Sequence, residues 1–215
     1  MREMRPGRAL KTSDTPSPRS DRLAAAELER TAQLLEASVP GMRGHARRVA
    51  VYAALTAQRI GLDPAAVTRI RRAGALHDIG KAEVPHEVLR STRPLAGEEF
   101  ELVRAHAHAG ARAVSVLGDE ELTAIVRHHH ERFDGGGYPD GLAGEAIPIG
   151  ARIVAVADTF DAVTSERPYR PALDQERALQ LLEREAGAQL DPEVVDAFQV
   201  HCSGLRAVLM AVRRR

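Results

Sequence analysis

The sequence predicts an all-α protein, and three observations lead to that prediction. Aromatic residues are 3% of the chain and tryptophan is absent, so the core must be built mainly from Ala, Leu, Val and Ile, a composition that favours helices. Apolar residues recur at intervals of three and four along most of the chain, as they do on one face of a helix. No segment shows the apolar–polar alternation of a half-buried strand.

Glycine and proline divide the periodic stretches into separate helices. Asp63 is expected to cap the third helix and Pro64 to take its first position. Residues 82–96, which contain Pro85 and Pro94, are expected to be irregular. The helices are expected over about residues 21–38, 42–60, 64–77, 96–118, 119–129, 151–165, 174–185 and 192–201.

The chain divides into four parts along its length. Residues 1–20 are rich in Pro, Ser and Thr, lack apolar periodicity and are expected to form a disordered tail. Residues 21–38 are expected to form an amphipathic helix that either packs on the domain or makes a homodimer contact. The main domain is expected over residues 39–205, and residues 206–215 are expected to form a solvated basic tail.

Composition excludes several classes of function. Lys+Arg and Asp+Glu number 30 each, so no overall charge favours a nucleic acid polymer or an anionic membrane. The single cysteine, Cys202, excludes an intramolecular disulfide and a CxxC metal site. No apolar run approaches the roughly 20 residues that span a bilayer, and the amino terminus lacks the apolar region of a secretory signal. A cytoplasmic location is therefore expected.

Histidines at apolar helix faces are the main chemical signal. A single histidine of this kind is more often a hydrogen-bonded core residue than a metal ligand. Burying several without partners would cost on the order of 1–3 kcal/mol for each unsatisfied group, and a shared metal centre would satisfy them together. The histidines and the accompanying carboxylates are His45, His77, Asp78, His106, His129, His130 and Asp158.

This donor set contains nitrogen and oxygen but no thiolate, which suits Fe, Mn, Zn, Ni or Co. Asp78, next to His77, could bridge two ions. Two ions about 3.5–4 Å apart are the usual arrangement for hydrolysing phosphate esters. Lys81 could place a positive charge near the phosphate, or could simply be a cation at a helix carboxyl terminus. After the second histidine pair, Gly135, Gly136 and Gly137 would let a ligand approach the backbone closely.

These motifs resemble the HD-GYP family, a branch of the HD phosphohydrolase superfamily. The resemblance runs from about His45 to Phe198 and comprises motifs in a family-like order. The motifs are His77-Asp78-Ile79-Gly80-Lys81, His129-His130-Glu131, Asp134-Gly135-Gly136-Gly137-Tyr138-Pro139, the run from Ala155 to Ala162, and Arg167-Pro168-Tyr169-Arg170.

The resemblance implies a bundle of about seven to nine helices that hydrolyses the bacterial second messenger cyclic di-GMP to pGpG, with GMP as an alternative end product, by metal-activated water. It implies Fe or Mn as the metal and the seven residues named above as ligands, with Asp78 bridging. Lys81 and Asp78 would be the catalytic side chains. The substrate would be held by Tyr138, Gly136, Gly137, Arg167 and Arg170. Glu131, Asp134 and Asp161 would fix ligands or the loop.

The chain also departs from the family pattern. Gly41 stands where members with three metals carry a glutamate, so two ions are expected. The run from Ala82 to His86 and Ala107 after His106 are unusual, which leaves substrate preference open. One alternative is a hydrolase of another cyclic dinucleotide or a nucleotide phosphate. Another is a weakly active docking module for a diguanylate cyclase or an adaptor. The first 38 residues are too few for a receiver or sensory domain.

Overall fold

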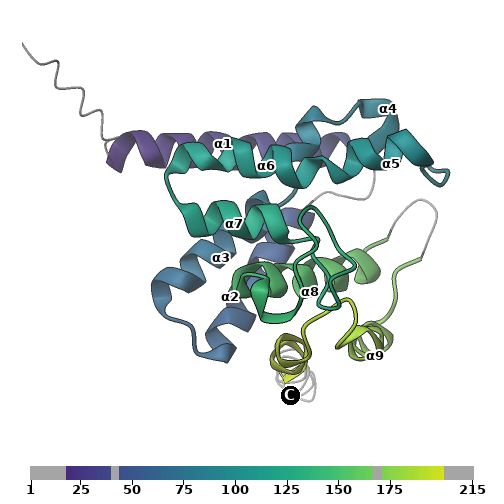
Figure 1. The fold of residues 1–215 in the computed structure, drawn as a ribbon. Coiled ribbons are helices and arrows are strands. Elements are labelled where there is room, and N and C mark those ends of the chain that lie inside the picture. The colour runs from purple at the N-terminus through teal and green to yellow at the C-terminus, as the bar shows by residue number, and fades with distance from the viewer. Residues whose placement is uncertain (1–17, 40–43, 167–170, 201–215) are drawn as a thin grey trace, which may run out of the picture.

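The computed structural model describes residues 18–39, 44–166 and 171–200, and Figure 1 shows this part of the chain as a bundle of helices. The only strand-like pairing among the described residues is an isolated bridge between Ala186 and Leu190, so the all-α prediction is confirmed. The elements are α1 (Pro18–Ser38), α2 (His45–Ile60), α3 (Pro64–Leu76), η1 (Ile79–Glu83), α4 (His86–Leu89), α5 (Gly97–Arg104), α6 (His106–Val114), η2 (Ser115–Leu117), α7 (Glu120–His128), η3 (Gly144–Ala146), α8 (Ile149–Thr164) and α9 (Gln175–Glu185). A further helical segment covers residues 192–200.

The helices are arranged in layers (Figure 1). Helices α2, α3, α7 and α8 lie between α1, α4, α5 and α6 on one side and α9 on the other. The central helices approach closely because the side chains between them are small. A β-carbon on Gly74 of α3 would come within 2.9 Å of Ala50 Cα in α2. Val49 and Ala53 of α2 and Val156 of α8 are fully buried, so this layer forms the centre of the hydrophobic core.

Aromatic side chains hold the helical segment 192–200 against the central layer. Phe198 packs on Tyr52 of α2 and Phe160 of α8, with ring centroids 5.9 and 4.9 Å apart. Tyr52 and Phe160 meet edge to face at 5.4 Å, a geometry that aromatic pairs favour. The last described helical turns are therefore part of the core.

Aspartate side chains cap three of the helices. Asp63 accepts hydrogen bonds from the backbone N–H groups of Ala65 and Ala66 at 2.8 and 3.0 Å, so the predicted cap of α3 is confirmed. Asp119 caps α7 and Asp174 caps α9 in the same way. Each carboxylate satisfies N–H groups that lack a partner within the helix.

The prediction of one helix over residues 96–118 is wrong. The structure has two helices, α5 and α6, separated at Ala105, and then the 3₁₀ turn η2. At the break, the carbonyl oxygen of Val103 is the hydrogen-bond partner of the His106 ring. A side chain that bonds a main-chain carbonyl competes with the regular helical pattern. Periodicity cannot reveal this, because it continues across the break.

Three other boundaries differ from the prediction. Residues 82–96 are not wholly irregular, since η1 reaches Glu83 and α4 forms a turn that buries Val88. Helix α1 begins at Pro18, three residues earlier than predicted, and proline suits the first helical position. Helix α2 begins at His45, three residues later than predicted, because Gly44 adopts φ 77° in the left-handed region. Residues 1–17 and 201–215, which include most of the predicted amino-terminal tail and all of the predicted basic tail, lie outside the described residues.

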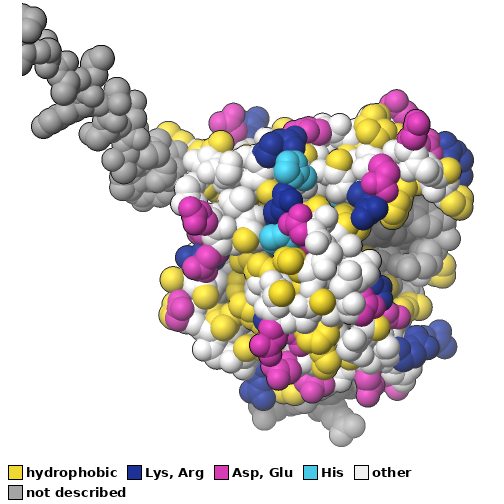
Figure 2. Space-filling model, viewed as in Figure 1, with side chains coloured by type: hydrophobic (Ala, Val, Ile, Leu, Met, Phe, Trp, Pro, Cys, Tyr) yellow, Lys and Arg dark blue, Asp and Glu magenta, His cyan; other side chains and the backbone are white. Residues whose placement is uncertain are grey.

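No helix in the described ranges is long and apolar enough to cross a membrane. Figure 2 shows acidic and basic side chains interspersed over one face of the molecule, with no large patch of a single sign. That face agrees with the balanced charge of the whole sequence.

Replacing Gly80 with alanine should destabilise the fold. A β-carbon at Gly80 would lie 2.0 Å from the carbonyl oxygen of His106 and 2.4 Å from the backbone nitrogen of Gly110. Since both are backbone atoms, α6 would have to move away from η1. We expect Gly80→Ala to lower the free energy of unfolding by about 1–3 kcal/mol, measured by urea denaturation.

Gly136→Ala is the matched control for this change. At Gly136 the nearest atoms to an added β-carbon belong to the side chains of Asp134 and Arg132, which can move. Its effect on unfolding should stay within about 0.5 kcal/mol. Equal stabilities of the two variants would show that η1 and α6 are not in close backbone contact.

Candidate metal centre

Helix ends bring the predicted ligands together. His45 begins α2, His106 begins α6, and His77 and His129 directly follow α3 and α7. All four histidines are at most 2% exposed. Asp78 directly follows His77, and His130 directly follows His129. Asp158 lies in the middle of α8. Six residues come from or directly after helix ends, so their positions depend on where four helices begin or stop.

The first donor group lies between α2 and α8. His45 Nε2 is 3.3 Å from His77 Nε2 and 3.3 Å from Asp158 Oδ1. Asp78 Oδ2 is 3.4 Å from His77 Nε2 and 3.8 Å from His45 Nε2. The ligand atoms of His45, His77 and Asp78 all fall within 4.8 Å of one another.

The second donor group lies between α6 and the end of α7. His106 Nε2 is 3.3 Å from His129 Nε2 and 3.4 Å from Asp78 Oδ1. The ring of His130 stacks 4.0 Å from that of His129 and 4.9 Å from that of His106. Asp78 thus gives one carboxylate oxygen to each group. A carboxylate in this position can bridge two ions.

The outer ring nitrogens of the histidines are fixed by hydrogen bonds. Nδ1 of His77 lies 2.9 Å from the carbonyl oxygen of Gly74, and Nδ1 of His129 lies 2.7 Å from that of Val126. His106 Nδ1 bonds the carbonyl oxygen of Val103 in the same way. Because a carbonyl oxygen only accepts, each Nδ1 must carry the proton, which leaves the Nε2 lone pair directed into the centre.

These lone pairs show that the residues fit metal ions. His106 Nε2 and His129 Nε2 face each other at 3.3 Å with no proton between them, and Asp78 Oδ1 is buried without a hydrogen-bond partner. Such a concentration of acceptors is unfavourable unless a cation lies among them. Ligand atoms around one ion with metal–nitrogen distances of about 2.0–2.1 Å are separated by about 3.0–3.4 Å. Five of the spacings given above, at 3.3–3.4 Å, match that range, whereas Asp78 Oδ2 lies farther from His45 Nε2, at 3.8 Å.

Burial keeps three of the histidines neutral. It lowers the pKa of His130 to about 3, with a contribution from the nearby His106. Burial also lowers the pKa of His129 well below its usual value, and it lowers the pKa of His106. A histidine must be neutral at the coordinating nitrogen to bind a metal, so these side chains need not lose a proton first.

His45 differs because carboxylates surround it. Burial lowers its pKa, but hydrogen bonds to Asp158 and Asp161 outweigh this and raise it to about 10. Nδ1 lies 2.8 Å from Asp161 Oδ2, and Arg48 holds the same carboxylate through two nitrogens. Coordination through Nε2 requires that the Nε2 proton leave, whereas the Nδ1 proton stays on the hydrogen bond to Asp161.

Lys81 lies at the open side of the centre. Its Nζ is 2.6 Å from Asp78 Oδ2, and its side chain is 23% exposed. Burial raises the pKa of Asp78, but the charges of Lys81 and of the neighbouring histidines outweigh this and hold the pKa well below its usual value. Asp78 is therefore an anion, and Lys81 is placed to contact both it and a bound anion.

The glycine loop is anchored to the helix end that carries the histidine pair. Glu131 Oε1 accepts a hydrogen bond from the backbone N–H of Asp140 at 2.7 Å. A β-carbon on Gly137 would lie 2.3 Å from the backbone nitrogen of Arg132, so this glycine permits close packing of the loop. Asp134 accepts from the N–H of Gly136 at 2.9 Å and pairs with Arg132.

Tyr138 connects this loop to the metal centre. The centroid of its ring lies 5.0 Å from the centroid of the His130 ring, and the guanidinium carbon of Arg104 lies 4.8 Å from the centroid of the Tyr138 ring. Burial and the negative charges of Asp78 and Asp158 raise the pKa of Tyr138, so the phenol stays protonated. The peptide bond from Tyr138 to Pro139 is cis.

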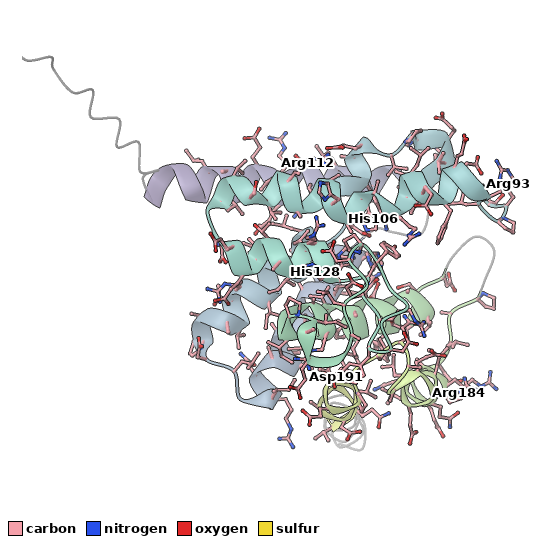
Figure 3. All side chains as sticks on the ribbon, viewed as in Figure 1. Arg93, His106, Arg112, His128, Arg184 and Asp191 are labelled. Carbon is pink, nitrogen blue, oxygen red and sulfur yellow. The ribbon has the colours of Figure 1, made fainter. Side chains whose placement is uncertain are left out.

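A further group of possible ligand atoms lies where the glycine loop bonds the end of α7. His128 Nε2 is 2.8 Å from Asp140 Oδ2, and Arg127 pairs with both oxygens of Asp140. Figure 3 shows His128 at the end of α7, beside α6, which carries His106. Because Arg127 and His128 already occupy the Asp140 carboxylate, we interpret this group as an ionic clasp between α7 and the loop.

Sequence reasoning missed several residues that support the site. Arg48 lies one turn after His45 on the same helix face, and that spacing could have indicated its role. Asp140 and Arg104 gave no signal, because their partners lie on other elements. Arg167, Arg170 and Gly41 lie outside the described residues, so the predicted roles of the two arginines and the argument for two ions stay predictions.

The family model described as "HD domain" matches residues 29–194. The cyclic di-GMP phosphodiesterase response regulator RpfG of Xanthomonas campestris pv. campestris is 40% identical over 174 residues, which are 80% of this chain and 46% of RpfG. The 3′3′-cGAMP-specific phosphodiesterase 3 of Vibrio cholerae is 37% identical over 168 residues, which are 78% of this chain and 36% of that protein. The chain thus spans less than half the length of either relative.

Solved structures share the fold. The crystal structure of the cyclic GMP-AMP-specific phosphodiesterase V-cGAP3 of V. cholerae superposes with a TM-score of 0.66 at 19% identity, covering 86% of this chain and 49% of that one. The family match over residues 29–194 shows that the chain belongs to the HD domain family, and its ordered His-Asp, His-His-Glu and Gly-Tyr-Pro motifs resemble those of the HD-GYP branch.

Proposed function

We propose that this chain is a metal-dependent phosphodiesterase that hydrolyses cyclic di-GMP to pGpG, with GMP as the alternative end product. The observation that carries the proposal is the pair of donor groups joined by Asp78, with Lys81 at its open side. The relatives named for cyclic di-GMP hydrolysis support the choice of substrate.

We propose two divalent ions, Fe or Mn, with His45, His77 and Asp158 in one group, His106, His129 and His130 in the other, and Asp78 in both. Zn, Ni and Co suit the same nitrogen and oxygen donors. Two bound ions supply a nucleophile at neutral pH, by lowering the pKa of water, and neutralise the charge of a phosphate diester. Asp161, Arg48 and the backbone carbonyls orient the rings so that the ligand atoms face one another.

The chain's own residues would position the phosphate. The Lys81 ammonium, 2.6 Å from Asp78, would donate to a phosphate oxygen as negative charge develops there. Tyr138, held between His130 and Arg104, forms one wall beside the second donor group. Arg167 and Arg170 are proposed to hold the phosphates or the bases of the substrate.

A second candidate substrate is 3′3′-cGAMP. The relative from V. cholerae that is named for this dinucleotide is 37% identical to the chain, close to the 40% of RpfG. Both substrates carry the same phosphodiester ring, so the metal centre alone does not distinguish them. Competition between the two dinucleotides in one turnover assay would rank them by kcat/KM.

The docking module stays an alternative proposal. Leu23 and Leu34 of α1 are 64% and 63% exposed, which leaves apolar surface for a homodimer contact or for a diguanylate cyclase or adaptor. A module without turnover would not require seven converging ligands. Turnover by the metal-loaded protein would therefore decide against a purely docking role.

Replacing Asp78 with alanine should abolish both metal binding and turnover. Asp78 contributes an oxygen to each donor group, so its loss disrupts both. We expect about two Fe or Mn ions per wild-type chain after anaerobic purification, fewer in Asp78→Ala, and a fall in cyclic di-GMP turnover of about 10³-fold or more. Metal analysis and turnover are measured on the same sample.

His86→Ala is the control for loss of a ligand-type side chain outside the centre, because His86 is exposed on α4. It should keep both metal and activity. A wild-type protein that stays empty in metal-supplemented medium would rule out the catalytic proposal, and full occupancy without turnover would point to another substrate.

Lys81→Met should separate charge from coordination. Methionine keeps much of the aliphatic length but removes the ammonium, so the metal content should stay near that of the wild type. The kcat for cyclic di-GMP should fall by about 10²–10³-fold, as expected for loss of a preorganised charge. Arg at the same position should restore part of the rate. Full activity of the metal-loaded Met variant would show that Lys81 serves only as a helix-end cation.

A further inference from the structure

A cavity of about 270 Å³ opens directly beside the metal centre. His130 and Asp158, both proposed ligands, form part of its lining. Pockets that take whole drug-sized ligands measure about 300–1,000 Å³. This cavity is therefore too small for a complete cyclic dinucleotide but has room for one part of it.

One face of α8 forms the apolar wall of the cavity. Ala155, Thr159, Ala162 and Val163 lie at helical spacings that put them on the same side as Asp158. Three of the four wall side chains are small and apolar, which suits the flat face of an aromatic ring. Because Asp158 lies on the same face, a ring against this wall would be attached to a phosphate near the metal centre.

Gln189 supplies a polar group to the lining of the cavity, next to Thr159 of the α8 wall. Its loop is fixed by backbone hydrogen bonds, since Gln189 O accepts from Phe133 N at 3.1 Å and Ala188 O accepts from Asp134 N at 2.9 Å. The adjacent Leu190 is buried. The Gln189 backbone is thus positioned by the same segment that follows the histidine pair.

The Gln189 amide, by contrast, is almost unused. Its Nε2 makes one long hydrogen bond of 3.5 Å to Thr159 Oγ1, and Thr159 itself donates to the carbonyl oxygen of Ala155 at 2.8 Å. Within the described ranges Gln189 Oε1 has no hydrogen-bond partner. A glutamine amide offers one donor and one acceptor side by side, and nucleobase edges present complementary pairs.

We propose that this cavity is a nucleobase subsite and that Gln189 is its specificity-determining residue. One base of the dinucleotide packs on the α8 wall, and its edge bonds the Gln189 amide while the attached phosphate faces Asp78 and Lys81. The inference rests on the proposed function for the identity of the substrate. It assigns a role to a residue outside the metal ligands and the glycine loop.

The test compares ligands with and without a base. Binding of GMP and of ribose 5-phosphate to Mn²⁺-loaded protein is measured by calorimetry for the wild type, Gln189→Ala and Gln58→Ala. Gln58 is exposed on α2 and makes no described side-chain contact, so it is the matched control. Gln189→Ala loses one hydrogen bond to the base. Its affinity for GMP should therefore fall about 5- to 10-fold more than its affinity for ribose 5-phosphate. Gln58→Ala should bind both ligands like the wild type.

Turnover provides a second readout. The kcat/KM of Gln189→Ala should fall about 5- to 10-fold more for cyclic di-GMP than for bis(p-nitrophenyl) phosphate, which has no base. Equal GMP affinities of wild type and Gln189→Ala, or equal losses for GMP and ribose 5-phosphate, would overturn the subsite. Failure of the proposed function is distinct: the wild type would not hydrolyse cyclic di-GMP, although GMP binding would still depend on Gln189.

Discussion

The meeting of acceptor atoms at the centre of the bundle is the constraint on which the structure depends. Nε2 atoms of two neutral histidines face each other at 3.3 Å, next to a buried oxygen of Asp78 that has no hydrogen-bond partner. An apolar core would avoid such an arrangement, because each unsatisfied acceptor costs on the order of 1–3 kcal/mol. The helices that carry these groups are nevertheless held in place by the hydrophobic core between them.

The positions of the helix ends bring these acceptor atoms together into one site. A residue at a helix end can direct its side chain along the axis and can use the nearest free carbonyl to fix a ring, as His77 and His129 do with Gly74 and Val126. Close backbone contacts then set the separation of the helices. Gly80 is required where η1 meets α6, so the spacing of the second donor group depends on a residue that binds nothing.

The loop after the histidine pair shows how one segment can serve both stability and function. Glu131 and Asp140 tie its two ends together, and Gly137 lets it lie against the backbone of Arg132. The same segment bonds the backbone around Gln189 and thereby positions the polar residue that lines the neighbouring cavity. Its glycines were expected from the sequence to admit a ligand, whereas Gly137 is needed first for packing of the protein on itself.

The sequence by itself determined the helical class, the cap at Asp63, most helix positions and the set of candidate ligands, because periodicity, capping and side-chain chemistry are local properties. It did not predict the break at Ala105, since a ring bonded to the Val103 carbonyl leaves the apolar period unchanged. Only the tertiary structure decided that Asp161, itself held by Arg48, bonds His45, that Arg104 lies over Tyr138, and that Gln189 contacts Thr159 of α8. These contacts join residues up to 116 positions apart, and their geometry follows from how the helices pack rather than from any local pattern.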